Sequence, residues 1–226
     1  MTVRGLIIDG FEGSGIVIRG SGNRIEGNYI GTDKFGTGDL GNGFAGVDMS
    51  DSTGNVVGGR AGNVIAFNKG DGVAVRDLAN SLPDTGNSIR SNSIFANGFL
   101  GIDLGNNGVT LNDPKDPDTG PNDLQNRPAL TSATTNAADE LTIIRGKLNS
   151  TPNQTFRIEF FGNPSGENEG KTFLGEKLVS TNADGVAKFA FAPAQAVPAG
   201  QNVTATATDQ GFNTSEFSPP RVVVAS

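Results

Sequence analysis

The sequence predicts an all-β chain, in which a parallel β-helix over residues 1–128 precedes an immunoglobulin-like β-sandwich over residues 129–226. An Asn- and Gly-rich unit recurs along the first part, and self-similarity on this scale is the signature of a solenoid. The chain has 33 Gly, which favours turns over long helices. The second part alternates apolar and polar residues in short runs bounded by turn residues, as β-strands do.

The repeat begins with Asn, or once with Phe11, and continues through three residues to a Gly and an apolar-x-apolar strand. Its four copies span residues 11–18, 42–49, 68–75 and 97–104. Side chains alternate along a strand, so the two apolar residues point inward and the middle residue points outward. We expect positive φ at the glycines that mark the coils, since only Gly adopts it without cost. These glycines are Gly15, Gly46, Gly72 and Gly101.

Each coil holds two more strands, which begin with Asn-x-(Ile/Val). The asparagines form the pairs Asn23/Asn28, Asn55/Asn63 and Asn87/Asn92. Asn tolerates left-handed turns, and its amide can stack on the amide of the next coil. We therefore expect asparagine ladders and three inner rows of apolar residues. The rows are Ile16/Ile18 with Val47/Met49, Val73/Val75 and Ile102/Leu104; Ile25 with Val57 and Ile89; and Ile8 with Ile30, Ile65 and Ile94.

Segments that leave the repeat are expected to be loops at 31–39 and 77–86 and a linker at 105–128. Residues 112–123 hold three Pro and four Asp, so we predict no regular strand or helix there. Beyond the linker, strand-like runs at 141–148, 155–161, 171–179, 187–191, 202–208 and 221–225 indicate about seven short strands, as in an immunoglobulin-like sandwich. The absence of Cys and Trp excludes an antibody-type domain.

The composition argues against several functions. There is no Cys for disulfide or thiol chemistry, and no His to act as the commonest general base or zinc ligand. A net charge of −7 without a basic run argues against nucleic acid as a partner. No apolar stretch is long enough to span a membrane and no signal peptide opens the chain, so we expect no membrane partner.

Residues 1–10 have the pattern of the last third of a coil, with no polar cap before them. Solenoids need caps because their end coils expose unpaired strand edges. We expect the chain to be a fragment of a longer secreted protein, or else to have this end covered by another subunit. Self-association through the open N-terminal end of the β-helix is the corresponding expectation.

Residues 5–130 resemble the right-handed parallel β-helix repeat proteins of the pectin-lyase-like superfamily, in the form found in large bacterial secreted and surface proteins. One part of the likeness is a segment at the end of the β-helix. The other part is the end of this chain, which resembles the end of the β-sandwich that commonly follows such a β-helix. These motifs are Gly101-Ile102-Asp103-Leu104-Gly105, Asn112-Asp113, Asp116, residues 118–122, Leu124-Gln125-Asn126, residues 204–209 and residues 213–218. The resemblance implies architecture and leaves activity open, because the superfamily holds lyases, hydrolases, phage tailspikes and adhesins.

One functional hypothesis is an enzyme, a polysaccharide lyase or glycoside hydrolase, that acts through the outward face of the β-helix. Asp48 and Asp103 occupy the outward middle position two coils apart, which is roughly 9.6 Å by strand spacing. That is near the ~6.5–9.5 Å between the carboxylates of inverting glycosidases, and Arg76 lies close in the sequence pattern. Against catalysis, Ala74 stands between the two aspartates, and either carboxylate is explained equally well as a solvated or loop-anchoring residue.

The hypothesis that we prefer is a non-enzymatic structural or adhesive module of a bacterial extracellular or cell-surface protein. A solenoid offers a long rigid surface for a glycan or a surface-protein partner. The aromatic supply is modest, with no Trp and only Tyr29 as tyrosine, so strong sugar stacking is not indicated by composition.

The acidic linker suggests a metal. Asp113, Asp116, Asp118 and Asp123 place four carboxylates within eleven residues, and hard cations such as Ca²⁺ prefer clustered oxygen ligands. The spacing departs from an EF-hand loop, because its Gly comes one place early and no Glu follows at the right distance. The alternative is an Asp-Pro turn region that caps its own backbone.

Overall fold

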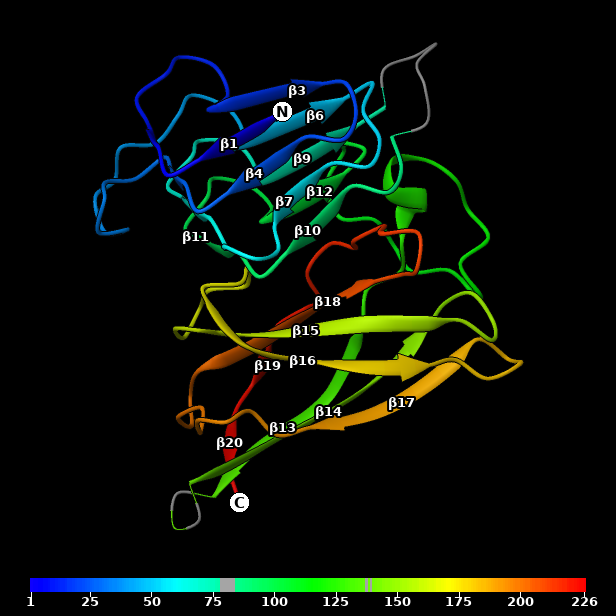
Figure 1. Cartoon of the computed structure of the whole chain (residues 1–226). Coiled ribbons are helices and arrows are strands. Elements are labelled where there is room, and N and C mark those ends of the chain that lie inside the picture. The colour runs from blue at the N-terminus through cyan, green and yellow to red at the C-terminus, as the bar shows by residue number, and fades with distance from the viewer. Residues whose placement is uncertain (78–83, 137, 139) are drawn as a thin grey trace.

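The structure is a computed structural model that describes residues 1–77, 84–136, 138 and 140–226. It is nearly all β, as predicted: a parallel β-helix stacks end to end on a β-sandwich (Figure 1). Most of the expected loop at 77–86 lies outside the described residues, whereas residues 31–39 do form a loop without regular structure. In the described part of the chain, no helix is long and apolar enough to cross a membrane.

Three parallel sheets, which we call A, B and C, form the β-helix, and each coil contributes one short strand to each of them. Sheet A contains β1 (Thr2–Arg4), β4 (Arg24–Glu26), β7 (Val56–Gly58) and β10 (Ser88–Arg90). Sheet B contains β2 (Ile7–Ile8), β5 (Tyr29–Ile30), β8 (Val64–Ala66) and β11 (Ser93–Phe95). Sheet C contains β3 (Ile16–Arg19), β6 (Val47–Ser50), β9 (Val73–Arg76) and β12 (Ile102–Leu104).

The strand registers confirm the three predicted inner rows. Ile25 pairs with Val57, Ile30 with Ile65, and Val47 with Val73, and the remaining members follow in the same register. These side chains form one buried core along the axis of the β-helix. The core is therefore a consequence of the two-residue alternation repeated once per coil.

Asparagine ladders join the coils, as predicted. In each ladder the side-chain Nδ2 of one Asn donates to Oδ1 of the Asn one coil further on, at 2.8–3.0 Å. The backbone N–H of the same Asn donates to that oxygen too, for example from Asn63 to Asn92 at 3.0 Å. The ladders are Asn23–Asn55–Asn87, Asn28–Asn63–Asn92 and Asn42–Asn68–Asn97.

The glycines that mark the coils serve a purpose other than the predicted one. None of the four has positive φ, so the expected left-handed turns are absent at these positions. A Cβ on Gly46 would lie 2.5 Å from Ile65 Cγ2 and 2.8 Å from Asn68 Nδ2. Gly is thus required because the backbone passes directly against the core and the asparagine ladder.

The sandwich consists of two four-stranded sheets, in the orders β17-β14-β13-β20 and β16-β15-β18-β19. Their strands are β13 (Ala129–Asn136), β14 (Leu141–Asn149), β15 (Thr155–Asn163), β16 (Thr172–Ser180), β17 (Val186–Phe191), β18 (Asn202–Thr208), β19 (Arg221–Val222) and β20 (Val224–Ala225). The predicted runs match these strands closely; β13 was missed, and the last run is divided in two. A separate apolar core fills the space between the sheets.

The linker contains one short 3-10 turn, η1 (Pro121–Leu124), where no regular element was predicted. Pro121 begins it, at a position where the missing N–H costs nothing. Within it, Asn122 has φ of 49° and is fully buried. Its Oδ1 accepts from the N–H of Asn87 at 3.0 Å, so η1 provides the final member of the first ladder.

Side chains of the sandwich cover the last coil of the β-helix. Glu169 accepts from Asn97 through both the backbone N–H (2.9 Å) and Nδ2 (2.8 Å), and so ends the third ladder. Glu159 accepts from the N–H of Ser91 at 2.9 Å. Gly170 pairs with Ile94 as an added bridge on sheet B. The sandwich therefore satisfies donors that a further coil would otherwise satisfy.

Burial at this junction changes the acidity of its carboxyls. Removal from water raises the pKa of Glu159 and of Glu169 to about 7 each, because the donated hydrogen bonds offset only part of the lost hydration. Burial also raises the pKa of Glu216, which accepts from Thr110 and pairs with Arg127 at 2.9 Å.

At the opposite end, β1, β2 and β3 are the edge strands of sheets A, B and C. Leu6 and Ile7 are about half exposed there. The expected self-association depends on these edge strands, and it stays a prediction.

We predict that Asn63→Ala lowers the free energy of unfolding by about 3 kcal/mol or more, because it leaves buried donors and an acceptor in two neighbouring coils without partners. Asn107→Ala, at an exposed side chain, is the matched control and should change it by less than about 0.5 kcal/mol. Urea unfolding measures both. Equally small effects of the two substitutions would mean that water molecules replace the lost hydrogen bonds of the ladder.

We predict that the protein is more stable at pH 5 than at pH 7.5. The folded-state pKa of Glu159 and Glu169 is about 7, above the 4.5 of an ordinary Glu. Between these values the folded chain holds protons that the unfolded chain releases, so stability falls as pH rises, on the order of 2 kcal/mol for each carboxyl. Urea unfolding at the two pH values tests this, and the double variant Glu159→Gln/Glu169→Gln should show a smaller difference. Greater wild-type stability at pH 7.5 would contradict it.

Candidate functional site

The outward positions of sheet C hold the residues that the sequence pattern suggested for chemistry. The register aligns Asp48 with Ala74, and Ala74 with Asp103, so the two aspartates lie two coils apart in one row, as predicted. The structure does not leave the two carboxylates free on an open face. Each has a local partner that explains its position.

Asp48 forms an ion pair with Arg76 from the next coil, with Arg76 Nε 2.9 Å from Asp48 Oδ1. The register places Arg76 beside Ser50, one outward position further along β6 and β9. Burial raises the pKa of Asp48, although the charges of Arg76 and Arg19 act in the opposite direction. The repeat thus predicted correctly that Arg76 lies near Asp48.

Asp103 is buried under the chain that follows β12. Its Oδ1 accepts from the N–H of Asn107 at 3.3 Å and its Oδ2 from the N–H of Gly108 at 3.1 Å. This is the loop-anchoring arrangement that stood as the alternative to catalysis. Both oxygens are engaged by the backbone, so Asp103 holds the start of the linker against sheet C.

A third acidic residue, Asp71, completes this face and was not singled out from the sequence. It belongs to the turn before β9, and its Oδ1 accepts from the N–H of Leu100 at 2.9 Å. Burial raises the pKa of Asp71, and the nearby charge of Asp103 adds to the increase. The signal was its place inside Gly70-Asp71-Gly72, where the other copies have an apolar residue or Ser before the coil-marking Gly.

Exposed phenyl rings stand beside these carboxylates. Phe44 and Phe99 occupy the same position two coils apart, with Gly70 between them: Gly70 N–H donates to Phe44 O, and Phe99 N–H donates to Gly70 O. The rings are 61% and 73% exposed, unusual for such large apolar groups. Strand spacing puts their backbones roughly 9.6 Å apart. Composition alone suggested a poor supply of aromatic contacts, and this pairing corrects that impression.

A hollow of about 480 Å³ lies next to Phe99, where Asp103 of β12 faces outward. Phe99, Leu100 and Val109 give it an apolar wall, and Asp71 and Asp103 give it a polar edge. An aromatic ring with carboxylate acceptors nearby suits a sugar, whose ring presents an apolar face and hydroxyl donors. Both carboxylates at this hollow already accept hydrogen bonds from backbone N–H groups.

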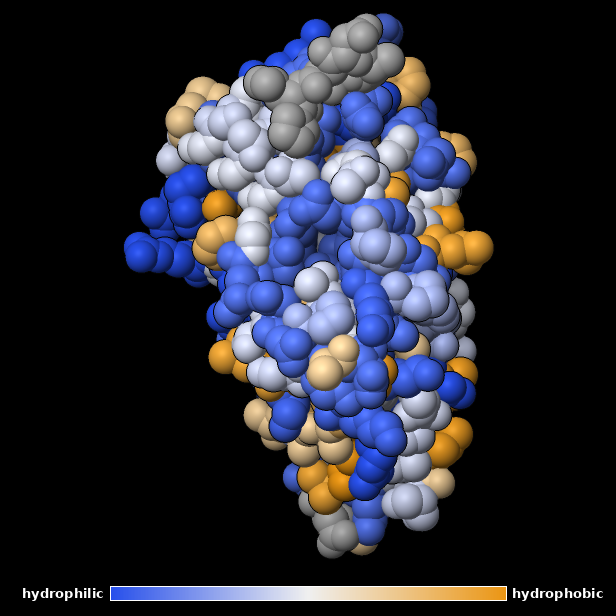
Figure 2. Space-filling view, turned by 90° about the vertical axis from the view of Figure 1, so that its right-hand side faces the viewer, coloured by the Kyte–Doolittle hydropathy of each residue, from blue (hydrophilic) through white to orange (hydrophobic). Residues whose placement is uncertain are grey.

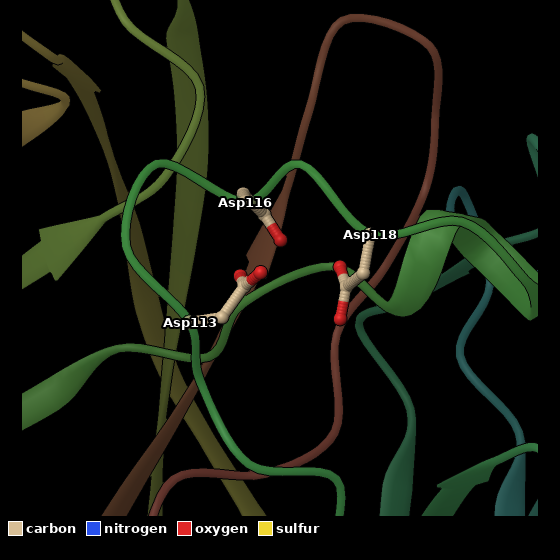
Figure 3. A group of neighbouring side chains, drawn as sticks. All are labelled: Asp113, Asp116 and Asp118. Atoms are coloured by element: carbon tan, nitrogen blue, oxygen red, sulfur yellow. The ribbon is translucent and has the colours of Figure 1, made fainter.

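The linker aspartates form a second candidate site. Asp113, Asp116 and Asp118 each present a carboxylate oxygen, and these oxygens lie within 4.8 Å of one another (Figure 3). On the face of the molecule that carries η1, hydrophilic residues predominate where the two parts of the chain meet (Figure 2). Asp123, the fourth residue predicted from the sequence, lies apart from this group and accepts from Nδ2 of Asn213 at 3.0 Å.

Asp116 accepts more hydrogen bonds than Asp113 or Asp118. Its carboxylate accepts from Nε2 of Gln125 (2.7 Å), from the N–H of Asn126 and from the hydroxyl of Ser150. The pKa of Asp116 is raised to about 6, chiefly by burial. The neighbouring charges of Asp118 and Asp113 contribute to this increase. Asp118 Oδ1 is buried and has no hydrogen-bond partner among the described residues.

Comparison with known proteins gives one partial match. No family model matches the chain. Over 86 residues the chain is 38% identical to 3-dehydroshikimate dehydratase of Acinetobacter baylyi (strain ATCC 33305 / BD413 / ADP1), a stretch that covers 36% of this chain. The chain spans 17% of the length of that protein.

Proposed function

We propose that this chain is a non-enzymatic structural and adhesive module of a bacterial extracellular or cell-surface protein, and that it binds a glycan on the outer face of sheet C. The β-helix is assigned in this proposal to the right-handed, pectin-lyase-like type, and the sandwich to the immunoglobulin-like type. Two four-stranded sheets around one core support the second assignment. Stacked three-strand coils support the first.

The exposed pair Phe44 and Phe99 carries the proposal. The two exposed rings belong to the turns that lead into β6 and β12, with Gly70 at the same position of the coil between them, and would offer a ligand an apolar contact. A pyranose ring stacked against a phenyl face is the contact that we propose. Asp71 and Asp103 line the adjoining hollow, and sugar hydroxyls would have to use acceptor positions that the backbone N–H bonds leave open.

A polysaccharide-cleaving enzyme is the second candidate. Asp48, Arg76 and Asp103 share the outward side of sheet C, and the relative with the partial match bears the name of an enzyme. The partners already engaged by Asp48 and Asp103 favour binding over turnover. Release of products from the bound polysaccharide would decide for the enzyme.

We predict that Phe99→Ser weakens retention of the protein on a bound polysaccharide about tenfold, because it removes a stacking contact of about 1.5 kcal/mol. Phe35→Ser is the matched control, since Phe35 is also 73% exposed but lies in the 31–39 loop. Affinity electrophoresis through gels with pectate, alginate or neutral glucans measures the retention.

Equal loss for both variants, or no retention on any glycan, would contradict the glycan proposal. Assay of the same mixtures for new reducing ends and for unsaturated products separates binding from cleavage. Turnover that is lost in Asp103→Asn would replace the adhesive function by the enzymatic one.

We also propose that the linker group Asp113, Asp116 and Asp118 binds Ca²⁺ and fixes the junction between the β-helix and the sandwich. Ca²⁺ takes six to eight oxygen ligands at about 2.3–2.6 Å, and three carboxylates close together supply a core of such ligands. Their mutual repulsion, which contributes to the raised pKa of Asp116, is the charge that a cation would neutralise. Asp123 is left as an outer residue of the same acidic region.

We predict that excess Ca²⁺ raises the Tm at pH 7.5 and does so much less at pH 5. The pKa of Asp116 is about 6, so at pH 5 binding would have to displace a proton. Asp118→Asn should abolish the shift, and Asp184→Asn, at an exposed carboxylate outside the group, should keep it. An unchanged Tm on addition of Ca²⁺ or of excess EDTA at pH 7.5 would contradict the proposal.

A further inference from the structure

A second hollow, of about 620 Å³, opens on the outer face of sheet A, where the β-helix meets the sandwich. Outward positions of the sheet provide Arg24, Val56 and Ser88, which are aligned by register across β4, β7 and β10. The sandwich closes the far end with Glu176 of β16 and Phe212 of the segment after β18. Both parts of the chain therefore build the walls.

Three arginines line this hollow: Arg24, Arg60 and Arg90. Arg24 pairs with Glu26, and Arg90 donates from Nε to Ser88 Oγ at 2.8 Å. Arg60 is exposed and has no ion pair within the described part of the chain. The one carboxylate that lines the hollow, Glu176, is engaged by Arg157.

The local charge is therefore positive, in a chain whose net charge is −7. Arg90 lies near the buried carboxyl of Glu159, and the raised pKa of that carboxyl weakens its compensation of the Arg90 charge near neutral pH. Guanidinium groups present planar, paired N–H donors that match the two oxygens of a carboxylate. Arg60 and Arg90 are therefore the two arginines that a carboxylate ligand would pair with.

The floor and end of the hollow are apolar. Val56 forms the floor, and Phe212 is 57% exposed at the end wall. Phe212 has φ of 69°, a left-handed conformation that is costly for an aromatic residue. An apolar wall opposite arginines suits a molecule that has a charged group at one side and a ring at the other.

We propose that this hollow binds a small carboxylate that carries a ring, with the carboxylate on Arg60 and Arg90 and the ring against Val56 and Phe212. The volume is within the range for small-molecule sites, about 300–1,000 Å³. The ring could be aromatic or that of a sugar acid, since both combine a carboxylate with an apolar face. The site lies on sheet A and so is independent of the glycan proposal for sheet C.

Calorimetric titration of the whole chain with benzoate and with glucuronate, at low ionic strength, tests the proposal. Benzamide provides the same ring without charge, and inorganic sulfate provides an anion without a ring. We expect at least one of the two carboxylates to bind, and both benzamide and sulfate to bind at least tenfold more weakly. Which carboxylate binds more tightly identifies the kind of ring.

Arg60→Gln should weaken binding about tenfold, because it removes a charge-assisted contact at a side chain without structural partners. Arg4→Gln is the matched control, since Arg4 is in the same outward row of sheet A as Arg90 but does not line the hollow. Phe212→Asn keeps a residue that tolerates positive φ and should weaken binding several-fold. Unchanged melting curves confirm that each variant folds.

Absence of binding by both carboxylates would overturn the proposal. So would sulfate bound as tightly as the carboxylates, or equal losses in Arg60→Gln and Arg4→Gln, because each would mean that only the general charge of the face matters. None of these results depends on Phe44 or Phe99, so failure here leaves the sheet C proposal standing.

Discussion

The structure depends on the hydrogen bonds of buried asparagines that hold each coil of the β-helix to the next. The strands are two to four residues long, so the backbone alone supplies few bonds per strand. At the turns between sheets, N–H groups would be buried without partners. In the ladders, one Oδ1 accepts from the backbone N–H and the Nδ2 of the preceding coil, which satisfies these donors and sets the register of the coils.

A ladder of this kind has a direction, and it cannot simply stop. Each Asn of an earlier coil donates its backbone N–H to the Asn of the next coil, so the N–H groups at the last coil need other acceptors. Asn122 and Glu169 supply them for two of the ladders, and Glu159 accepts from the turn that holds the last member of the other. This arrangement buries the carboxyl groups of Glu159 and Glu169 at the junction, and burial raises their pKa. The position of the sandwich thus follows from the chemistry of the open coil end.

Much of the β-helix could be predicted from the sequence, because its inner rows rest on spacings of two residues that repeat once per coil. The role of Gly46 could not, since only the packed structure reveals how closely Ile65 and Asn68 approach it. Glu159 and Glu169 carry no local signal either. Glu159 alternates with apolar neighbours like any strand residue facing water, and its partner Ser91 is 68 residues away.

The candidate sites, too, could be predicted from the sequence only in part. The row that holds Asp48 and Asp103 followed from the repeat, whereas the burial of Asp103 depends on how the chain returns after β12. The approach of Asp113, Asp116 and Asp118 followed from their nearness in sequence. The hollow on sheet A did not, because it joins turns of the β-helix to Glu176 and Phe212 of the sandwich.

Because the inner rows and ladders are fixed by packing, only outward positions and turns are free to differ between coils. That freedom explains how Asp71, Phe99 and Asp103 line the hollow beside sheet C while three arginines line the hollow beside sheet A. The sheets surround one core, so the outward residues of sheet A and of sheet C lie on different sides of the β-helix. In solvent at physiological salt, charges separated by more than about 8 Å are largely screened. Ligands bound as proposed on sheet A and on sheet C would therefore not weaken each other, as they would in a single shared cleft.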